Sequence, residues 1–328
     1  MGKPLKKKIS TISKPLPPDL SDASDTQLLR LFSKAQRAPW PGLKISPQHR
    51  PLRVTPRRRY RRIALSGFFD ALPLELIDMI FLQLDYVSLS RLSATNTKAE
   101  SFIKTRPYYK LIVENCHLFL GELRRIGFSH VPCAASIYHA ICNPTCSGPD
   151  CTRLAGLFFL PTCQRYCYQC VGKTPQSRAL CTIMVEEEYH IPRGDILDNL
   201  LCLRSSERSK SLFVLEADVI NLTMRLFGEE RRVCCSNRWW SRDLTSLPLP
   251  FVDPETKGVE QGRLCRACNA AFKQLAHCWE DIECGPSVEE LVMWRKDLEK
   301  EESGNKVYGK KQLLQHLRSG ECPHAQEF

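Results

Sequence analysis

The sequence predicts a mainly α-helical protein: a small unit of three short helices, followed by an irregular, mostly helical body that carries many cysteines. Two observations lead to this prediction. Between residues 66 and 110, leucine and isoleucine recur every four residues, which is the spacing of one helix face. From Cys142, 6 cysteines fall within 29 residues, and a second group of cysteine and histidine lies near residues 265–322. Such clusters are typical of metal-ligand turns.

The composition is that of a globular protein. The 328 residues are 43% hydrophobic and 25% charged, which excludes a wholly disordered or fibrous chain and leaves room for about two compact units. The longest dense apolar stretch, residues 154–160, is too short to cross a bilayer. The first residues lack the apolar core of a secretory signal, so we expect a protein of the nucleus, the cytoplasm or both, and not a secreted one.

The positive charge is confined to one end of the chain. Residues 1–62 contain 16 Lys and Arg against 3 Asp and Glu, a net charge of +13, whereas the whole chain carries +11. Residues 63–328 therefore carry a net charge of −2. A folded domain that reads nucleic acid needs a basic face, and this division argues against one.

Residues 1–62 are predicted to be a disordered basic tail. They are rich in proline and contain two basic blocks, residues 6–8 and 57–62, so they cannot bury enough apolar surface to offset their ordering entropy. The blocks fit a nuclear import signal or serve only solubility. Within the tail, residues 25–34 form an amphipathic patch that could be a transient helix or a docking motif.

Residues 72–84 are predicted to be the first helix. Leu72, Leu76, Ile80 and Leu84 recur every four residues, and Pro73 suits the first turn, where its missing N–H costs nothing. Apolar residues surround this helix almost completely, more than three short helices can cover. Either the following domain or a partner must therefore bury the remainder.

Two further helices follow within the same 45 residues. Asp85 can end the first helix and cap the second, which carries Leu89 and Leu92. The third is marked by Phe102 and Ile103. A unit of this size is close to the lower limit for a core that stands alone.

The joint spacing of Leu72-Pro73, Glu75-Leu76, Ile80, Leu84-Asp85 and Leu89-x-x-Leu92 resembles the F-box, in the form common among fungal proteins. The resemblance covers about residues 66–110. It departs from the family late in the motif, where Phe102 stands in place of the common Trp.

The resemblance implies a function. F-box domains dock onto the Skp-type adaptor of cullin–RING ubiquitin ligases through the Leu-Pro turn and the apolar helix faces. It implies that the positions contacting the adaptor are Leu72, Pro73, Leu76, Ile77, Ile80, Leu84 and Leu89.

The first cysteine cluster predicts a zinc site. Zinc is held by four soft or borderline ligands in a tetrahedron, and two short Cys-x(2–4)-Cys turns can supply them. Cys146 and Cys151 form one pair and Cys167 and Cys170 the other, with Cys142 and Cys163 as substitutes. The alternative is that these residues are small buried hydrophobic side chains.

The second group predicts another zinc site. Cys265-x2-Cys268 is one half, and His316 on a helix over residues 310–317 followed by Cys322 is the other. The two halves are separated by 47 residues, which include a helix predicted over residues 287–301. Fungal F-box proteins with a cysteine-bearing C-terminal region are similar to this layout. The alternative is a surface histidine and unrelated thiols.

The remaining body is read as helices over residues 195–203 and 212–227, and residues 238–242 form either an aromatic–basic recognition patch or packed aromatic side chains. Residues 111–328 are thus predicted as one cysteine-bearing helical domain stabilised by one or two structural zinc ions.

The sequence supports three classes of function to different extents. The favoured one is a non-catalytic F-box receptor that binds a Skp-type adaptor, and through it a cullin, and recruits a protein substrate through the cysteine-bearing body. The alternative is a nuclear zinc protein that uses its basic tail to bind nucleic acid or protein. An enzyme is least supported, because the sequence contains no nucleotide-binding glycine loop and no hydrolase or metalloprotease motif. Nor do the clusters show the Cys-x-His step of a RING-type ligase.

Overall fold

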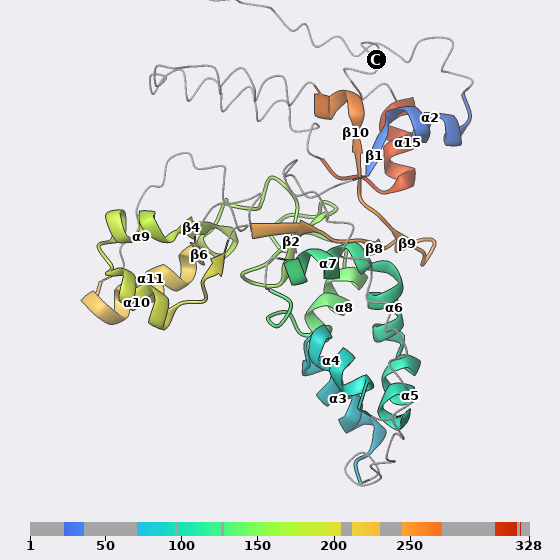
Figure 1. Ribbon diagram of the computed structural model, residues 1–328. Helices are drawn as coiled ribbons and strands as arrows, with labels where there is room; N and C mark the ends of the chain where they lie inside the picture. Colours follow the sequence, from blue (N-terminus) through green and yellow to red (C-terminus); the bar gives the residue numbers. More distant parts are fainter. Residues whose placement is uncertain are drawn as a thin grey trace, which may run out of the picture. The chain divides into compact units, whose positions relative to one another are not determined.

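The computed structural model (Figure 1) describes residues 23–35, 71–95, 97–125, 128–204, 212–229, 245–270, 306–319 and 322. These residues belong to two compact units. One unit combines residues 1–36 with residues 261–328, and the other spans residues 37–260. This division differs from the single domain predicted over residues 111–328, because the last part of the chain clusters with the N-terminal segment.

The helical part of the larger unit begins with the helices that the sequence predicts. They are α3 (Leu74–Gln83), α4 (Tyr86–Ser93) and α5 (Thr97–Thr105), followed by α6 (Pro107–Asn115), α7 (His117–Arg125) and α8 (Ala134–Cys142). The apolar period therefore predicted α3, α4 and α5 correctly, whereas α6, α7 and α8 were not predicted as separate helices. α8 packs against α3 and α6.

One hydrophobic core runs from these helices into the first cysteine cluster. Ile77 and Phe81 of α3, Ile137 of α8 and Phe158 of a short sheet all belong to it, and all are buried. The helices of residues 66–110 therefore share a core with the residues that follow them. These residues bury part of the apolar surface that three short helices could not cover by themselves.

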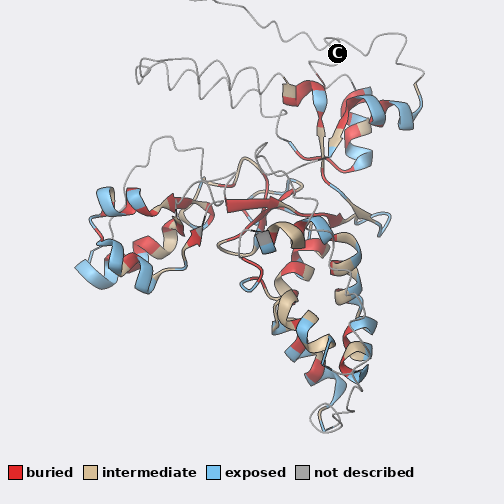
Figure 2. Ribbon diagram, viewed as in Figure 1, coloured by how far each residue is buried: buried red, intermediate tan, exposed pale blue. Residues whose placement is uncertain are grey.

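The centre of the larger unit contains strands. β2 (Leu157–Phe159) lies between β3 (Gln164–Tyr166) and β7 (Ser246–Pro248) in an antiparallel sheet, and β8 (Phe251–Val252) pairs with β9 (Val259–Glu260). β2 is buried along its whole length (Figure 2), as expected for a run of apolar residues in a central strand.

Arg165 of β3 is a buried cation that ties this centre together. Its guanidinium donates to the backbone carbonyls of Ala140 at the end of α8, of Ala155, and of Leu249 and Pro250 before β8. Burial lowers the pKa of Arg165 to about 9, while the nearby Cys116 thiol acts in the opposite direction. The side chain thus donates hydrogen bonds to backbone carbonyls of three separate segments and holds these segments together.

A lobe with its own core follows the first cysteine cluster. It is built from η1 (Pro175–Ser177), β4 (Ala179–Cys181), α9 (Thr182–Tyr189), α10 (Arg193–Asn199), β5 (Leu203–Arg204), β6 (Leu212–Leu215) and α11 (Glu216–Phe227). The strand order is β4-β6-β5. Two predicted helices are therefore too long: residues 203–204 and 212–215 are strands, and only residues 193–199 and 216–227 are helical.

The smaller unit joins distant parts of the chain. α2 (Asp25–Phe32) and β1 (Ser33–Ala35) pack with β10 (Arg263–Cys265) and α15 (Lys310–Arg318). Residues 25–34, predicted as an amphipathic patch that is a transient helix or a docking motif, contain the helix α2. Residues 25–35 therefore depart from the disordered tail predicted over residues 1–62, because they bury apolar side chains on a segment about 230 residues away. The basic blocks, the helix at residues 287–301 and the aromatic patch at 238–242 lie outside the described residues.

The described residues are thus mainly helical, as predicted, and they also form short strands that the sequence did not predict. Within the described residues, no helix combines the length and the apolar character needed to cross a membrane.

Candidate functional site

The first candidate site is an apolar row on α3. Met79 and Ile80 lie three and four residues after Leu76, so the three side chains share one helix face. This face is opposite to that of Ile77 and Phe81, which pack into the core. Met79 is 63% exposed, Leu76 44% and Ile80 39%. An exposed row of large apolar side chains on one helix is typical of a protein-docking surface.

The structure divides the residues that the resemblance assigns to adaptor contact. Pro73, Leu76 and Ile80 are exposed, and Leu72 and Leu84 are half-buried. Ile77 and Leu89 are buried in the chain's own core, so they support the helices from behind and offer no surface. Because apolar residues surround this part of the chain almost completely, the apolar period does not show which side chains pack into the core and which are exposed.

Leu74 and Met79 were not among the predicted contact residues, yet both side chains are exposed. Met79 could have been predicted from its position, because it is an apolar residue on the helix face opposite to Ile77 and Phe81.

Two polar contacts fix the position of α3. Arg106 donates from Nη1 to the Asp78 carboxylate at 3.0 Å, and the Tyr108 hydroxyl lies 3.4 Å from the other oxygen of that carboxylate. Since Arg106 precedes α6, these contacts hold α3 against the start of α6, independently of the apolar row on its other face.

Asp85 sets the turn between α3 and α4, as predicted. Its Oδ1 accepts from the backbone N–H groups of Val87 and Ser88, both at 2.9 Å, and its Oδ2 accepts from the Ser88 hydroxyl at 2.5 Å. Burial raises the pKa of Asp85, but the hydrogen bonds from Ser88 and Val87 together outweigh it, so that the pKa lies below its usual value. The charged carboxylate is therefore a stable N-cap.

The second candidate site is the first set of cysteines. The sulfur atoms of Cys146, Cys151, Cys167 and Cys170 lie within 4.8 Å of one another, and those of Cys151 and Cys167 are 3.9 Å apart. The structure thus brings together the four residues that the sequence analysis selected, and the set could hold a metal ion. Of the two substitutes, Cys163 instead directs its sulfur toward the Leu160 carbonyl, and Cys142 lies at the end of α8 near Tyr138.

Backbone N–H groups point at the sulfur of Cys146. The N–H of Gly148 lies 3.3 Å from it and the N–H of Cys167 lies 3.2 Å from it. Hydrogen bonds from such donors stabilise a thiolate, which is the form that binds metal. A hydrogen bond with Cys146 is the main cause that lowers the pKa of Cys167 to about 5, against the effect of burial.

Gly148 is required because the backbone at this position lies very close to the Cys170 side chain. A Cβ atom on this residue would lie 2.8 Å from the Cys170 sulfur and 2.9 Å from the Cys170 Cβ. The turn between the first two cysteines therefore passes so close to the second pair that only glycine fits there.

The third candidate site is the second set, in the smaller unit. Cys265, Cys268, His316 and Cys322 are all buried, and their ligand atoms lie within 4.8 Å of one another. The Cys322 sulfur is 3.5 Å from those of both Cys265 and Cys268. His316 Nε2 is 3.4 Å from the Cys268 sulfur. This set could also hold a metal ion.

The histidine is oriented by an aromatic neighbour. The rings of His316 and Tyr308 are stacked, with centroids 4.9 Å apart. The histidine is thus packed as part of a buried cluster and is not the surface side chain of the alternative interpretation. The neighbouring Cys278, Cys284, His277 and His324 lie outside the described residues.

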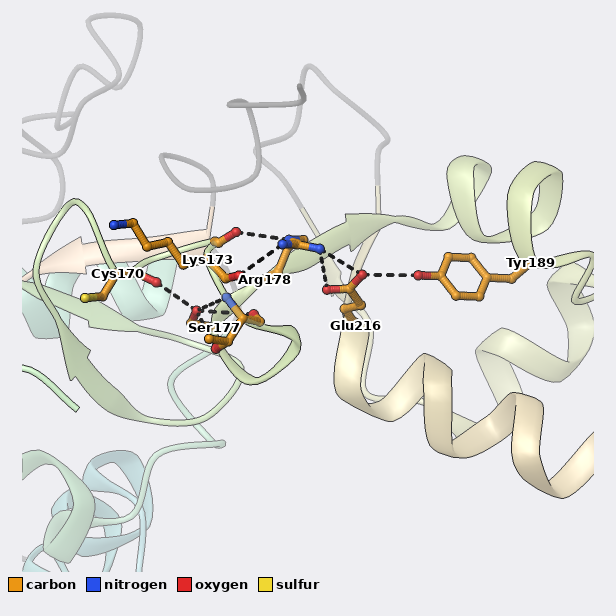
Figure 3. Close-up of polar contacts among 8 residues, drawn as sticks. Cys170, Lys173, Ser177, Arg178, Tyr189 and Glu216 are labelled. Carbon is orange, nitrogen blue, oxygen red and sulfur yellow. Dashed lines mark hydrogen bonds and ion pairs between the residues drawn. The ribbon is translucent and has the colours of Figure 1, made fainter. Parts of the chain in front are cut away.

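A polar network connects the first cysteine set to the adjoining lobe (Figure 3). Ser177 donates to the Cys170 carbonyl, and Arg178 donates to the carbonyls of Gly172 and Lys173. Nη1 of Arg178 also lies 3.0 and 2.9 Å from the two carboxylate oxygens of the buried Glu216 at the start of α11. No local sequence pattern predicts this ion pair, because Arg178 and Glu216 are separated by 38 positions.

Comparison with known proteins agrees with the helical part of this description. The F-box domain family matches residues 69–111, which include α3, α4, α5 and the first part of α6. No curated protein and no solved structure gives a significant match to the chain. Residues 69–111 of this chain are therefore an F-box domain.

Proposed function

We propose that the chain is a non-catalytic substrate-recognition subunit of a cullin–RING ubiquitin ligase. Its F-box binds a Skp-type adaptor, and the rest of the larger unit, with the smaller unit, recruits a protein substrate. The transfer chemistry belongs to the ligase partners. Such a subunit acts in the nucleus or the cytoplasm.

The observation that supports this proposal most directly is the exposed row of Leu76, Met79 and Ile80 on an F-box helix. Burying a large apolar side chain contributes about 1.5–3 kcal/mol relative to leaving it exposed. Since the opposite face of α3 is already packed, the helix can offer this row without losing its own support. The proposed contact set is therefore the row itself with Pro73 and the half-buried Leu72 and Leu84.

We propose further that both cysteine sets bind zinc as a structural ion. A zinc ion with sulfur ligands at about 2.3 Å in a tetrahedron places those atoms about 3.8 Å apart. The sulfur–sulfur distances of 3.5 and 3.9 Å lie close to this value. Cys146, Cys151, Cys167 and Cys170 would hold one ion, and Cys265, Cys268, His316 and Cys322 the other, with all four protein positions filled as in a structural site.

The alternative function is a nuclear zinc protein that binds nucleic acid or protein through residues 1–62 without a ligase role. Its support is the net charge of +13 on those residues. The two proposals differ in what the α3 row does: only the receptor uses it for capture.

The test is capture of a purified Skp-type adaptor by the full chain. Three samples are compared: wild type, Ile80→Asp on the α3 row, and Ile183→Asp, where the same change is made at an exposed isoleucine of α9. We expect wild type and Ile183→Asp to bind equally and Ile80→Asp to bind at least about 30-fold more weakly, because an unpaired charge would be buried in the interface. Circular dichroism and zinc content are measured on each sample.

A folded, zinc-loaded wild type that does not capture the adaptor would overturn the receptor proposal, and equal capture by Ile80→Asp would overturn the assigned face. In the first case, salt-dependent binding of DNA or RNA, lost when residues 1–62 are removed, would favour the alternative.

A further inference from the structure

In the smaller unit, a segment from the other end of the chain packs on two elements. Residues 24–35 lie against both β10 and α15, and we call the surface that these two elements present to the segment the groove. We call residues 24–35 the N-terminal segment. Its strand β1 runs antiparallel to β10, with Ser33 opposite Cys265 and Ala35 opposite Arg263, and its helix α2 packs on α15.

Backbone pairing makes the segment a strand of a small sheet. The edge of β10 that faces away from β1 forms two hydrogen bonds with Tyr308. The Arg263 N–H donates to the Tyr308 carbonyl, and the Tyr308 N–H donates to the Arg263 carbonyl. β10 is therefore a central strand, and β1 covers the edge that would otherwise present unpaired backbone groups. Addition of a strand to a sheet edge is a common mode of peptide recognition.

One face of α2 is buried in the groove. Leu28 is 1% exposed and Phe32 4%, and both belong to one cluster with Leu313 and Leu317 of α15. Leu31 on the other face of the same helix is 51% exposed. The helix thus anchors itself by side chains at the i and i+4 spacing expected of an amphipathic helix in a groove.

Polar contacts fix both ends of the segment. The Asp25 carboxylate lies 2.6 Å from Nη2 of Arg318, and the Ser33 hydroxyl accepts from Nη1 of Arg263 at 3.1 Å. Ser24 and Gln27 form a capping box, so the segment carries its own helix-start signal. These polar contacts fix the register and the direction of the N-terminal segment, and the buried apolar side chains hold it in place.

The four metal-ligating residues join the two walls of this groove. Cys265 ends β10 and Cys268 lies in the helical residues 266–270 that follow it, whereas His316 lies on α15 and Cys322 comes after that helix. The three cysteines of the set belong to the same hydrophobic cluster as Leu28 and Phe32. A metal held by these residues therefore fixes the distance between β10 and α15, which is the dimension that the N-terminal segment needs.

We propose that the groove between β10 and α15 is a peptide-binding site that the metal assembles and that residues 24–35 of the same chain occupy. This inference rests on the proposed metal site of the smaller unit, and it is independent of adaptor binding. By linkage, the metal raises the affinity of the groove for the segment, and the segment raises the affinity for the metal by the same factor. The site selects a capped amphipathic helix with apolar residues at the positions of Leu28 and Phe32, followed by a short strand.

The experiment separates the segment from its groove without shortening the chain. A protease site is inserted between residues 50 and 51 of the full chain, and the zinc-loaded protein is cut and passed over a gel-filtration column. We expect the N-terminal fragment to co-elute with the remainder. Removal of zinc with a chelator, checked by elemental analysis, is expected to release it.

Matched variants of α2 test the groove itself. Phe32→Asp places a charge on the buried face and is expected to lower the retained fraction about tenfold or more with zinc bound. Leu31→Asp makes the same kind of change on the exposed face and is expected to retain the fragment as wild type does. In both uncut variants, the rate of zinc transfer to a chelating dye is measured: a faster transfer is expected for Phe32→Asp alone.

Three results would overturn the inference: release of the wild-type fragment while zinc is bound, retention after zinc is removed, or equal retention of Phe32→Asp and wild type. A wild type that contains no zinc would overturn the metal coupling together with the proposed metal sites. Adaptor capture by the same cut sample reports on the receptor proposal separately, since it depends on the α3 row.

Discussion

Ile77 and Ile80 lie three residues apart on α3 and have opposite environments: Ile77 is 2% exposed, within the core, and Ile80 is 39% exposed, on the apolar row. The pair separates the two tasks of an F-box helix. One side anchors the helix to the chain, and the other remains available to a partner. The same type of side chain at both positions provides a direct comparison of these tasks.

The first prediction uses this pair. Ile77→Ala creates a cavity in the core and should lower the free energy of unfolding by about 2–5 kcal/mol. Ile80→Ala should cost less than about 1 kcal/mol in stability but weaken adaptor capture about tenfold. Denaturant unfolding and a binding titration at a temperature where both variants are folded provide the measurements. A stability loss for Ile80→Ala as large as that for Ile77→Ala would contradict the assignment of the two faces.

The second prediction concerns Gly148. Adding a Cβ at this position forces the turn away from Cys170, so Gly148→Ala should strain the first metal set. We expect zinc to leave that site about tenfold faster, while the second set keeps its ion. Zinc release to a chelating dye, followed in two phases, measures this effect. Gly194→Ala is the control, because no atom lies within 4 Å of its added Cβ; an equal effect of both variants would contradict the prediction.

Local signals allowed much of this structure to be predicted from the sequence. The helices α3, α4 and α5 follow from apolar spacing and from the cap at Asp85, and both cysteine sets follow from pairs of ligands separated by two to five residues. Their prediction needed only that the two pairs of each set meet, and the structure brings the four ligand atoms of each set within 4.8 Å of one another.

The parts that could not be predicted depend on distant partners. Residues 212–215 are four apolar residues that run directly into α11, so their period does not distinguish a buried strand from a helix turn. β1 is a strand only because β10 lies beside it, about 230 residues later in the chain. The pair Ser24 and Gln27 was a local sign of the helix α2, since Ser-x-x-Gln is a capping box.

The third prediction concerns the network of Arg178, Glu216 and Tyr189. Glu216 is buried, and its carboxylate accepts from Arg178 and, at 3.2 Å, from the Tyr189 hydroxyl. Glu216→Ala leaves both donors without this acceptor and should destabilise the lobe of residues 179–227 by about 1.5–3 kcal/mol, toward the lower end because Arg178 is partly exposed. Hydrogen exchange of the lobe, followed by mass spectrometry, should become faster. Glu187→Gln, on the exposed side of α9, should leave it unchanged.

The last prediction concerns the pH dependence of the Asp85 cap. Asp85→Ala should lower the free energy of unfolding at neutral pH by about 1 kcal/mol, because the N–H groups of Val87 and Ser88 lose their acceptor. The folded-state pKa of Asp85 lies below the unfolded value of about 3.9, so the charged cap stabilises the protein above that pH. Its contribution is lost as the pH falls through the folded-state pKa.

The difference in stability between wild type and Asp85→Ala should therefore be constant from pH 5 to 7 and shrink below about pH 4. Urea unfolding followed by circular dichroism at each pH measures it. His130, whose Nδ1 lies 3.6 Å from the Asp85 carboxylate, is replaced by glutamine in both chains, so that this contact does not contribute to the measured difference. A difference that grows on acidification would show that the carboxyl group caps α4 better when protonated, and would contradict the role assigned to its charge.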